Sequence, residues 1–403
     1  MELFWLEHKK LWRKKIVKIC VLLCFVYYVI FGSILSFQWF SFGSSDDYTS
    51  AFGNNFDGYT VIKDSQEYAL SFGGELTDET LQKIVSDYQQ MEVDGMEEEL
   101  EKTDWQIVNS WLGTLYPELR DTSNYKTMIS YVDPDKLTGF YERRQQVLDE
   151  FLEVSGQVGA EKEYLHQIER KVEKPFRYEW VEGWSTLLGS MVADLGVVMA
   201  LFLGIVLSSL FAGEWHDNTS TLVLTTRNGW GKIALAKILT GLAFTVELFA
   251  LLAVSSVISQ LFFMGTAGWD MPIQNIKLIA VAPMNMLQAE IYEYAFVLLG
   301  AIGFAGIVMF ISAAVKNNVL TLLLSLAVVY GPMMIAEYLP YGMQKALDLI
   351  PLVGSSTDIF RTNTFRIFGK LIWSPYLIII IPVLIGILCM PFAIKSWSRR
   401  MKA

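Results

Sequence analysis

Six long apolar stretches limit what this chain can fold into more than any other feature of the sequence. A helix needs about 17–25 mostly apolar residues to cross the hydrocarbon core of a bilayer. Residues 16–38, 184–211, 233–264, 292–315, 319–336 and 371–394 meet that requirement. Hydrophobic residues make up 53% of the 403 residues and charged residues 18%, a balance too apolar for an ordinary soluble protein. The sequence therefore predicts an all-α polytopic membrane protein with six transmembrane helices.

The distribution of charged residues divides the chain into an acidic part and a basic part. Residues 39–183 contain 30 Asp and Glu but only 13 Lys and Arg, whereas the whole chain contains 42 acidic and 32 basic residues. The remainder of the chain is therefore basic, and its bases lie beside the apolar stretches. This predicts an acidic water-soluble insertion joined to a basic-edged membrane part, and nothing in it favours a nucleic-acid partner.

Basic residues beside the first and last stretches predict the orientation in the membrane, because Lys and Arg accumulate on the cytosolic side. We therefore expect both termini in the cytosol, residues 39–183 outside, and residues 212–232 and 316–318 inside. Outer loops at residues 265–291 and 337–370 and a cytosolic tail at residues 395–403 complete this topology. The bases that carry it are Lys9, Lys10, Arg13, Lys14, Lys15 and Lys18 at one end and Lys395, Arg399, Arg400 and Lys402 at the other. Arg361, Arg366 and Lys370 oppose it, because they fall in a predicted outer loop.

Residues 1–15 predict a short amphipathic helix at the membrane surface, since Leu3, Phe4, Leu6 and Leu11 are interleaved with charges. An ordinary cytosolic tail is the alternative. A cleaved signal peptide does not fit, because the apolar run that follows exceeds the about 7–15 residues of such a segment.

The insertion at residues 39–183 is expected to be α-rich, with an added small sheet (α+β) as the alternative. Thr77 is a candidate N-cap, and Leu81, Ile84, Val85 and Tyr88 recur at helical spacing after it. A second helical region is expected from residue 134 onward. The three cysteines all lie in predicted spans, so no disulfide framework is expected in the insertion.

Two features within the predicted spans indicate helix packing or a polar site. Gly196, Ala200, Gly204 and Ser208 recur every four residues, a spacing that lets two helices approach closely, either within the chain or between two copies. Small residues without such a role are the alternative. Glu247 lies about 22 Å of helix beyond Lys232, and so near the bilayer midplane. Its carboxylate would then need a partner, a water-filled cavity or a proton, and a structural hydrogen bond, a substrate path and ion coupling remain open.

The polar segment between the second and third spans is longer than a membrane hairpin requires, and the chain has no P-loop with which to bind ATP. This segment resembles the first cytosolic loop of ABC transporter permease subunits of the ABC-2 class, which have six spans, cytosolic termini and often a large extracellular domain between the first two spans. The matching order of residues is Phe211, Glu214, Asn218, Thr219, Leu222, Leu224, Thr225, Thr226, Arg227, Lys232 and Lys237.

The resemblance implies that this loop is a coupling helix that docks on a separate ATPase subunit. The implied docking residues are Glu214, Asn218, Thr219, Leu222, Leu224, Arg227 and Lys232. It further implies a second permease copy or paralogue as partner, a bacterial plasma membrane location, and export of an amphipathic peptide, lipid or hydrophobic drug. The chain would bind no cofactor and perform no catalysis, and ATP and magnesium would be bound by the ATPase subunit.

Two other classes of function remain open from the residues alone. The chain could be a membrane-anchored sensor or binding protein whose outer domain captures a ligand. It could also be a secondary transporter driven through Glu247, which would require no ATPase.

Overall fold

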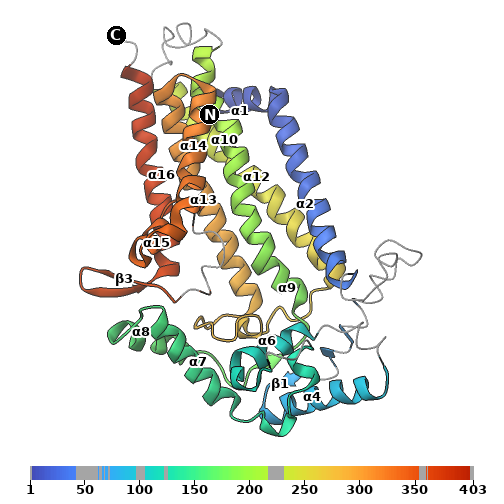
Figure 1. The fold of residues 1–403 in the computed structure, drawn as a ribbon. Helices are drawn as coiled ribbons and strands as arrows, with labels where there is room; N and C mark the ends of the chain where they lie inside the picture. Colours follow the sequence, from blue (N-terminus) through green and yellow to red (C-terminus); the bar gives the residue numbers. More distant parts are fainter. Residues whose placement is uncertain are drawn as a thin grey trace.

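The computed structural model describes residues 2–41, 62, 66–67, 69–70, 73–96, 105–121, 126–216, 231–353, 360 and 362–399. A bundle of long helices forms one part of the protein. The described residues from 62 to 181, here called the insertion domain, lie at one end of this bundle (Figure 1). Helix α1 (Glu2–Arg13) and the C-terminal end of α16 (Ser374–Arg399) lie at the opposite end, here called the loop end.

Within the described residues, six helices are long and apolar enough to cross a membrane, as expected for a multi-pass membrane protein. They are α2 (Lys15–Ser41), α10 (Val192–His216) with the turns that lead into it, α12 (Lys232–Met264), α13 (Met286–Val315), α14 (Asn318–Ile335) and α16. The turns that precede α10 are α9 (Glu182–Thr186) and a π-helix over Leu187–Met191.

Helices α13 and α16 begin several residues away from the first residues of the spans that the sequence predicts. Helix α13 begins at Met286, not at residue 292, because Asn285 and Gln288 form a reciprocal capping box there. Glu290 and Glu293 consequently lie inside the helix, and both are buried. Helix α16 begins at Ser374, not at residue 371, because the preceding residues form a β-strand.

Helix α13 lies at the centre of the bundle, and its closest neighbour is α16. A Cβ atom added at Gly303 would lie 2.3 Å from the Pro382 carbonyl oxygen, and one added at Gly306 would lie 2.5 Å from that of Gly386. No real Cβ atom approaches a carbonyl that closely, so these glycines permit the contact between the two backbones.

The described part of the insertion domain is α-rich, as expected, and it also contains the small sheet that was the alternative. Its elements are β1 (Gly74–Glu75), α4 (Asp78–Val93), α6 (Gln106–Leu115), α7 (Phe140–Val154), α8 (Ala160–Glu169) and β2 (Arg177–Tyr178), with short 3-10 turns at Pro117–Leu119, Met128–Ser130 and Pro134–Lys136. Strands β1 and β2 pair antiparallel. The predicted cap is confirmed, since the Thr77 side chain accepts a hydrogen bond from the Thr80 amide and Leu81, Ile84 and Val85 are buried.

Tryptophan side chains bond the insertion domain and its exit segment to the chain that joins α12 to α13. The Trp111 indole donates to the Asn275 carbonyl at 3.1 Å, the Trp180 indole to Met264 at 3.0 Å, and the Trp184 indole to Ala267 at 2.9 Å. Asn275 ends a 3-10 turn over Ile273–Asn275. The domain is therefore attached to the bundle by more than its two covalent connections.

Arg144 makes a fully buried polar contact in this junction. Its guanidinium is 0% exposed and donates to the carbonyls of Leu278 and Ala280 and to the Glu169 carboxylate. Lys174 also contacts Glu169, at 2.8 Å. A buried guanidinium needs this many partners because leaving it unpaired is costly.

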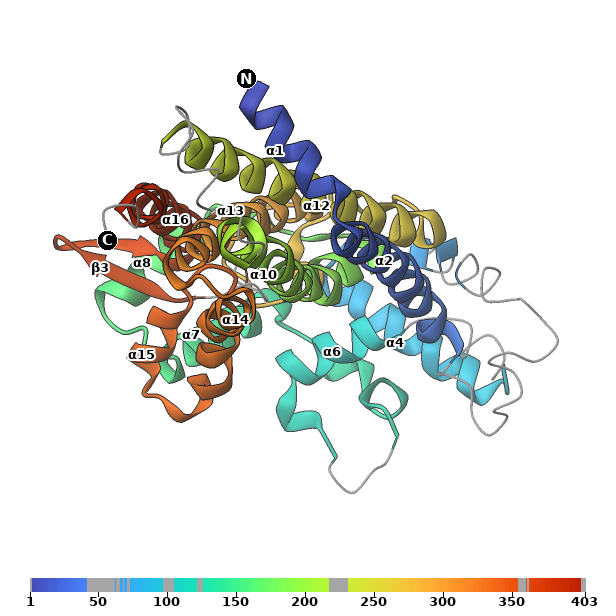
Figure 2. The same ribbon diagram turned by 90° about the horizontal axis from the view of Figure 1, so that it is seen from above.

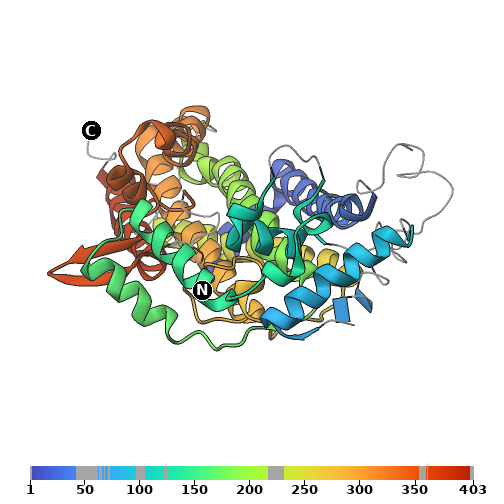
Figure 3. The ribbon, with the colours of Figure 1, turned by 60° about the horizontal axis from the view of Figure 1, so that its bottom comes forward.

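The segment between α14 and α16 forms a 3-10 turn (Ala336–Tyr338), α15 (Tyr341–Leu347) and a hairpin of β3 (Thr364–Ile367) and β4 (Lys370–Trp373). This hairpin and α8 lie side by side (Figure 3). Arg366 in β3 pairs with Glu161 of α8 at 2.7 Å. A base that opposes the predicted orientation is thus neutralised by the acidic insertion domain.

Candidate functional site

The candidate site lies at the loop end of the bundle, where α1 crosses α10 and α12. Helix α1 carries Glu2 in its first turn and Lys10 and Arg13 in its last, which suits the helix dipole. Leu11 is its buried residue, whereas Trp5 and Leu6 are 62% and 64% exposed. The predicted amphipathic helix is therefore present, and it turns at Lys14 into α2.

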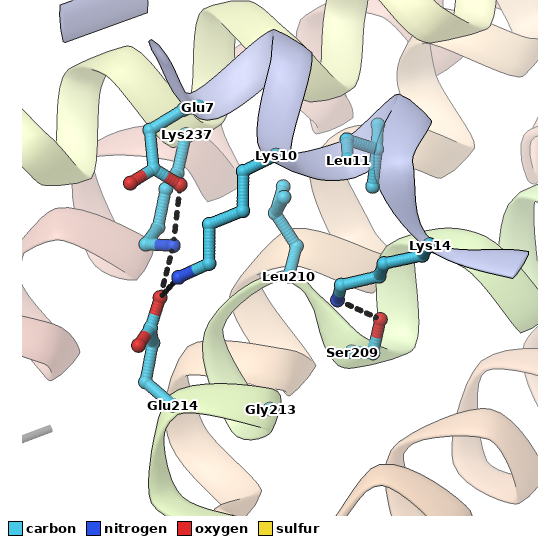
Figure 4. Close-up of a pocket in the computed structure, with 9 residues that line it drawn as sticks. All are labelled: Glu7, Lys10, Leu11, Lys14, Ser209, Leu210, Gly213, Glu214 and Lys237. Carbon is cyan, nitrogen blue, oxygen red and sulfur yellow. Dashed lines mark hydrogen bonds and ion pairs between the residues drawn. The ribbon is translucent and has the colours of Figure 1, made fainter. Parts of the chain in front are cut away.

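Four charged side chains from the three helices meet beneath α1 (Figure 4). Glu214 near the end of α10 accepts from Lys10 Nζ at 2.5 Å and from Lys237 Nζ of α12 at 2.8 Å, both on Oε1. Lys237 Nζ also lies 2.7 Å from Glu7 Oε2. We call Glu7, Lys10, Glu214 and Lys237 the ion cluster.

The ion cluster is largely removed from solvent. Lys237 is 2% and Glu214 4% exposed, whereas Glu7 is 16% and Lys10 52% exposed. The Coulomb attraction between charges is stronger where water is excluded, and each buried charge here has at least two partners of opposite sign. Beside the cluster, Lys14 Nζ donates to the Ser209 hydroxyl at 3.0 Å. These contacts join α1 to the end of α10 and the start of α12.

The same end of α10 contacts the C-terminal half of the bundle through aromatic rings. Trp397 of α16 meets Phe211 and Trp215 edge-on, with ring centroids 5.5 Å and 6.0 Å apart. Lys316, which follows α13, places its Nζ 4.2 Å from the centre of the Trp215 ring. The last turns of α10 therefore contact α1, α12, α16 and the turn between α13 and α14.

Hydrogen bonds of the Ser312 side chain also join α13 to the last turns of α10. Ser312 Oγ of α13 accepts from the amides of Phe211 and Ala212 at 3.1 Å each and donates to the Ser208 carbonyl at 2.7 Å. Since Ser208, Ser312 and Ala212 are buried, these bonds have no competition from water.

The predicted docking residues fall into two groups. Glu214 and Lys232 lie in the part of the chain that the structure describes, and Asn218, Thr219, Leu222, Leu224 and Arg227 lie outside it. Lys232 begins α12 and is exposed. Glu214 is turned inward to the ion cluster, so its carboxylate holds the chain's own helices together.

The stripe of small residues on α10 is packed within the chain. Gly196, Ala200, Gly204 and Ser208 are all buried. A Cβ atom at Gly204 would lie 3.2 Å from the Leu326 side chain of α14 and 3.3 Å from that of Leu322. The Tyr330 hydroxyl of α14 donates to the Val197 carbonyl at 3.0 Å. In this structure the stripe is a contact between helices of one chain.

Glu247 has two partners on α1. Its carboxylate lies 3.2 Å from His8 Nε2 and accepts from the Trp12 indole at 3.0 Å, and it is 41% exposed. The upright helix assumed in estimating its depth does not apply, because α12 runs obliquely across the bundle when seen from above (Figure 2). Glu247 thus lies level with the helix that the sequence places at the membrane surface.

Sequence reasoning did not find Glu7 and Lys10 as site residues and did not predict a partner for Lys237. A lysine five residues into an apolar helix is a signal for a buried partner. The sequence does not show which acid is that partner. Glu7 and Glu214 are both distant from Lys237 along the chain, and they reach it only because α1 crosses the bundle beside α10 and α12.

Comparisons with known proteins add no identification, since no protein-family model, no curated protein and no solved structure matches this chain.

Proposed function

We propose that the chain is the membrane-spanning permease subunit of an ATP-driven exporter of the ABC-2 class, and that a separate ATPase subunit supplies the energy. Six helices that can cross a membrane, an amphipathic N-terminal helix and a polar segment between α10 and α12 support this proposal. The observation that carries it is the ion cluster, which joins both flanks of that polar segment to α1.

The ion cluster supplies the mechanical link that such a subunit needs. A force applied to residues 217–230 by an ATPase would reach Glu214 on α10 and Lys237 on α12 through short stretches of chain. Because the two side chains are bonded to each other and to α1, the three helices respond together. Rigid helices that move against their neighbours are a common means of transmitting such motion.

The inward position of Glu214 changes the roles assigned within the docking residues. We assign Glu214 and Lys237 to positioning the loop and Leu222 and Leu224 to docking, since two leucines within a polar rim suit a groove on a partner. Glu214→Arg is consequently a poor test of docking, because it would disrupt the ion cluster as well.

The second permease copy of this proposal is expected to pack against α14. The apolar segment of the second span has 72% of its residues buried within the chain, whereas that of the fifth span, α14, has only 17% buried. The large exposed apolar residues of α14 are Val319, Leu320, Leu323, Leu324, Met334 and Ile335. An amphipathic substrate, such as a peptide, a lipid or a hydrophobic drug, would then pass beside α14 at the contact between the two copies.

Co-purification tests the docking assignment. We expect Leu222→Glu to lose association with the proposed ATPase subunit, and with it the stimulation of ATP hydrolysis, while the protein stays in the membrane. The matched control is Val154→Glu, which places the same charge on an 89% exposed valine at the opposite end of the protein. Equal recovery of the ATPase with both variants would refute the docking assignment.

A further inference from the structure

The hairpin of β3 and β4 carries an aromatic residue at its tip that makes little contact with the rest of the protein. Phe368 is 102% exposed, and its backbone is left-handed with φ 49°, as is that of Gly369 with φ 79°. Turns of this type favour Asn-Gly or Gly-Gly, because a side chain in the left-handed region is strained. A phenylalanine here combines backbone strain with a fully exposed apolar ring. Contact of the ring with something outside the chain would offset both costs.

The two faces of the hairpin differ in character. Directly paired residues of antiparallel strands share a face. On one face, Thr364 donates to Gln157 at 2.8 Å and Arg366 pairs with Glu161 at 2.7 Å, so this face lies on the insertion domain. The opposite face carries the pairs Phe365–Ile372 and Ile367–Lys370. Its apolar residues Phe365, Ile367 and Ile372 are half-buried, and Lys345 of α15 places its Nζ 5.1 Å from the centre of the Phe365 ring. Apart from Arg366, the exposed part of the hairpin is therefore its tip, at Phe368, Gly369 and Lys370.

The hairpin also continues the surface that the bundle presents to lipid. It lies between α8 and the adjoining end of the bundle and projects sideways beyond α16 (Figure 1). Strand β4 leads directly into α16. The large exposed side chains of α16 from Tyr376 to Phe392 are apolar: Tyr376, Ile380, Leu384, Ile387, Leu388 and Phe392. Lipid tails suit such a face on a helix that crosses a membrane, and an aromatic residue such as Tyr376 is typical of the interface.

We propose that the β3–β4 hairpin is a membrane-contacting element that lies in the phospholipid headgroup layer on the side of the insertion domain. Phe368 contacts the upper acyl chains, and Lys370 contacts the phosphates of anionic lipids. The partner is the lipid surface, because the hairpin leads directly into α16, whose exposed side chains next to it are apolar, and because its exposed tip carries a basic residue beside the aromatic ring. This element would hold the insertion domain close to the membrane, and it does not depend on the transport function.

Spin labelling in a bilayer tests this placement. The full chain, with Cys20, Cys24 and Cys389 replaced by alanine, is reconstituted into nanodiscs of phosphatidylethanolamine and phosphatidylglycerol. It is labelled at Phe368→Cys, and collisions with oxygen and with a water-soluble nickel chelate are compared. Leu384→Cys on α16 is the lipid-exposed reference, and Val93→Cys, 80% exposed at the end of α4, is the reference in water.

We expect the oxygen-to-nickel ratio at position 368 to be clearly higher than at position 93 and closer to that at position 384. A ratio equal to that at position 93 would place the tip in water and overturn the proposal. Low accessibility to both reagents would also overturn it, because a second copy of the chain would then cover the tip.

A second pair of variants distinguishes membrane contact from a hairpin damaged by the label. A label at Lys370→Cys is measured with and without Phe368→Gly, a substitution that suits the left-handed turn. We expect the oxygen-to-nickel ratio at position 370 to fall when the ring is removed. An unchanged ratio would show that Phe368 does not hold the hairpin on the membrane and would contradict its assigned role.

Discussion

Lys237 Nζ lies 2.8 Å from Glu214 Oε1, and neither side chain is more than 4% exposed. The two residues belong to different helices, and the polar segment of residues 217–230 separates them in the sequence. Burying two charges is costly unless they are well paired, and here Lys10 and Glu7 complete the pairing from a third helix. The arrangement makes the two flanks of this segment one mechanical unit with α1.

Breaking the ion cluster is therefore expected to destabilise the loop end of the bundle. Glu214→Gln or Lys237→Met should each lower the free energy of unfolding by about 1–3 kcal/mol, because a buried charge then loses one of its bonded partners. Thermal unfolding in detergent measures this. The control is Lys9→Gln on the exposed side of α1, which should change little.

A double variant shows whether the two residues act through each other. If they do, the loss in Glu214→Gln/Lys237→Met should be smaller than the sum of the two single losses. Strictly additive losses would mean that the 2.8 Å contact contributes no coupling energy.

The Arg144–Glu169 pair is expected to make the attachment of the insertion domain sensitive to acid. Burial raises the pKa of the Glu169 carboxyl, but hydrogen bonds from Lys174 and Arg144 outweigh burial, so its pKa is lowered below the usual value. A carboxyl with a lowered pKa in the folded state contributes stability above its unfolded pKa of about 4.3, and this contribution is lost as the pH falls through the folded pKa.

Unfolding followed as a function of pH measures this contribution. Below about pH 4.3 the wild-type chain should lose stability more steeply than Glu169→Gln, which should already be less stable at pH 7 because Arg144 stays buried with one anionic partner fewer. Identical pH dependence of unfolding in the two proteins would show that protonation of the Glu169 carboxylate does not affect the stability of the domain.

The backbone contact between α13 and α16 is expected to tolerate no side chain at Gly303. Gly303→Ala would place a methyl group 2.3 Å from the Pro382 carbonyl oxygen, and a well-packed contact that must open costs about 1–3 kcal/mol. Gly331→Ala in α14 is the matched control, because no atom lies within 4 Å of its added Cβ and alanine favours the helix. Equal melting temperatures for the two variants would contradict the contact.

Glu247 separates an ATP-driven transporter from one driven by an ion gradient. Glu247→Gln keeps an oxygen that can accept from Trp12 and removes the charge that faces His8. Because this carboxylate is 41% exposed, stability should change by less than about 1 kcal/mol. ATP-dependent transport should persist in proteoliposomes, and its abolition together with sensitivity to a proton or sodium gradient would favour the secondary-transporter alternative.

The sequence by itself determined the number of long apolar helices, the amphipathic N-terminal helix, the α-rich insertion and the Thr77 cap. Each of these depends on local pattern: hydrophobic length, helical periodicity, or a side chain that bonds to an amide three residues away. Helix α13 begins before the apolar span predicted from residue 292, because the Asn285 capping box lies outside the purely apolar stretch.

Tertiary structure alone decided which charges meet and which helices touch. Lys237 finds Glu7 and Glu214, and Arg366 finds Glu161, across long stretches of chain. A close contact between two helix backbones likewise forms at Gly303 and Gly306, whereas the more regular stripe on α10 packs against the longer side chains of α14. The physical reason is that spacing in the sequence defines the faces of a helix, but the crossing and tilt of the helices decide which faces and which charges meet.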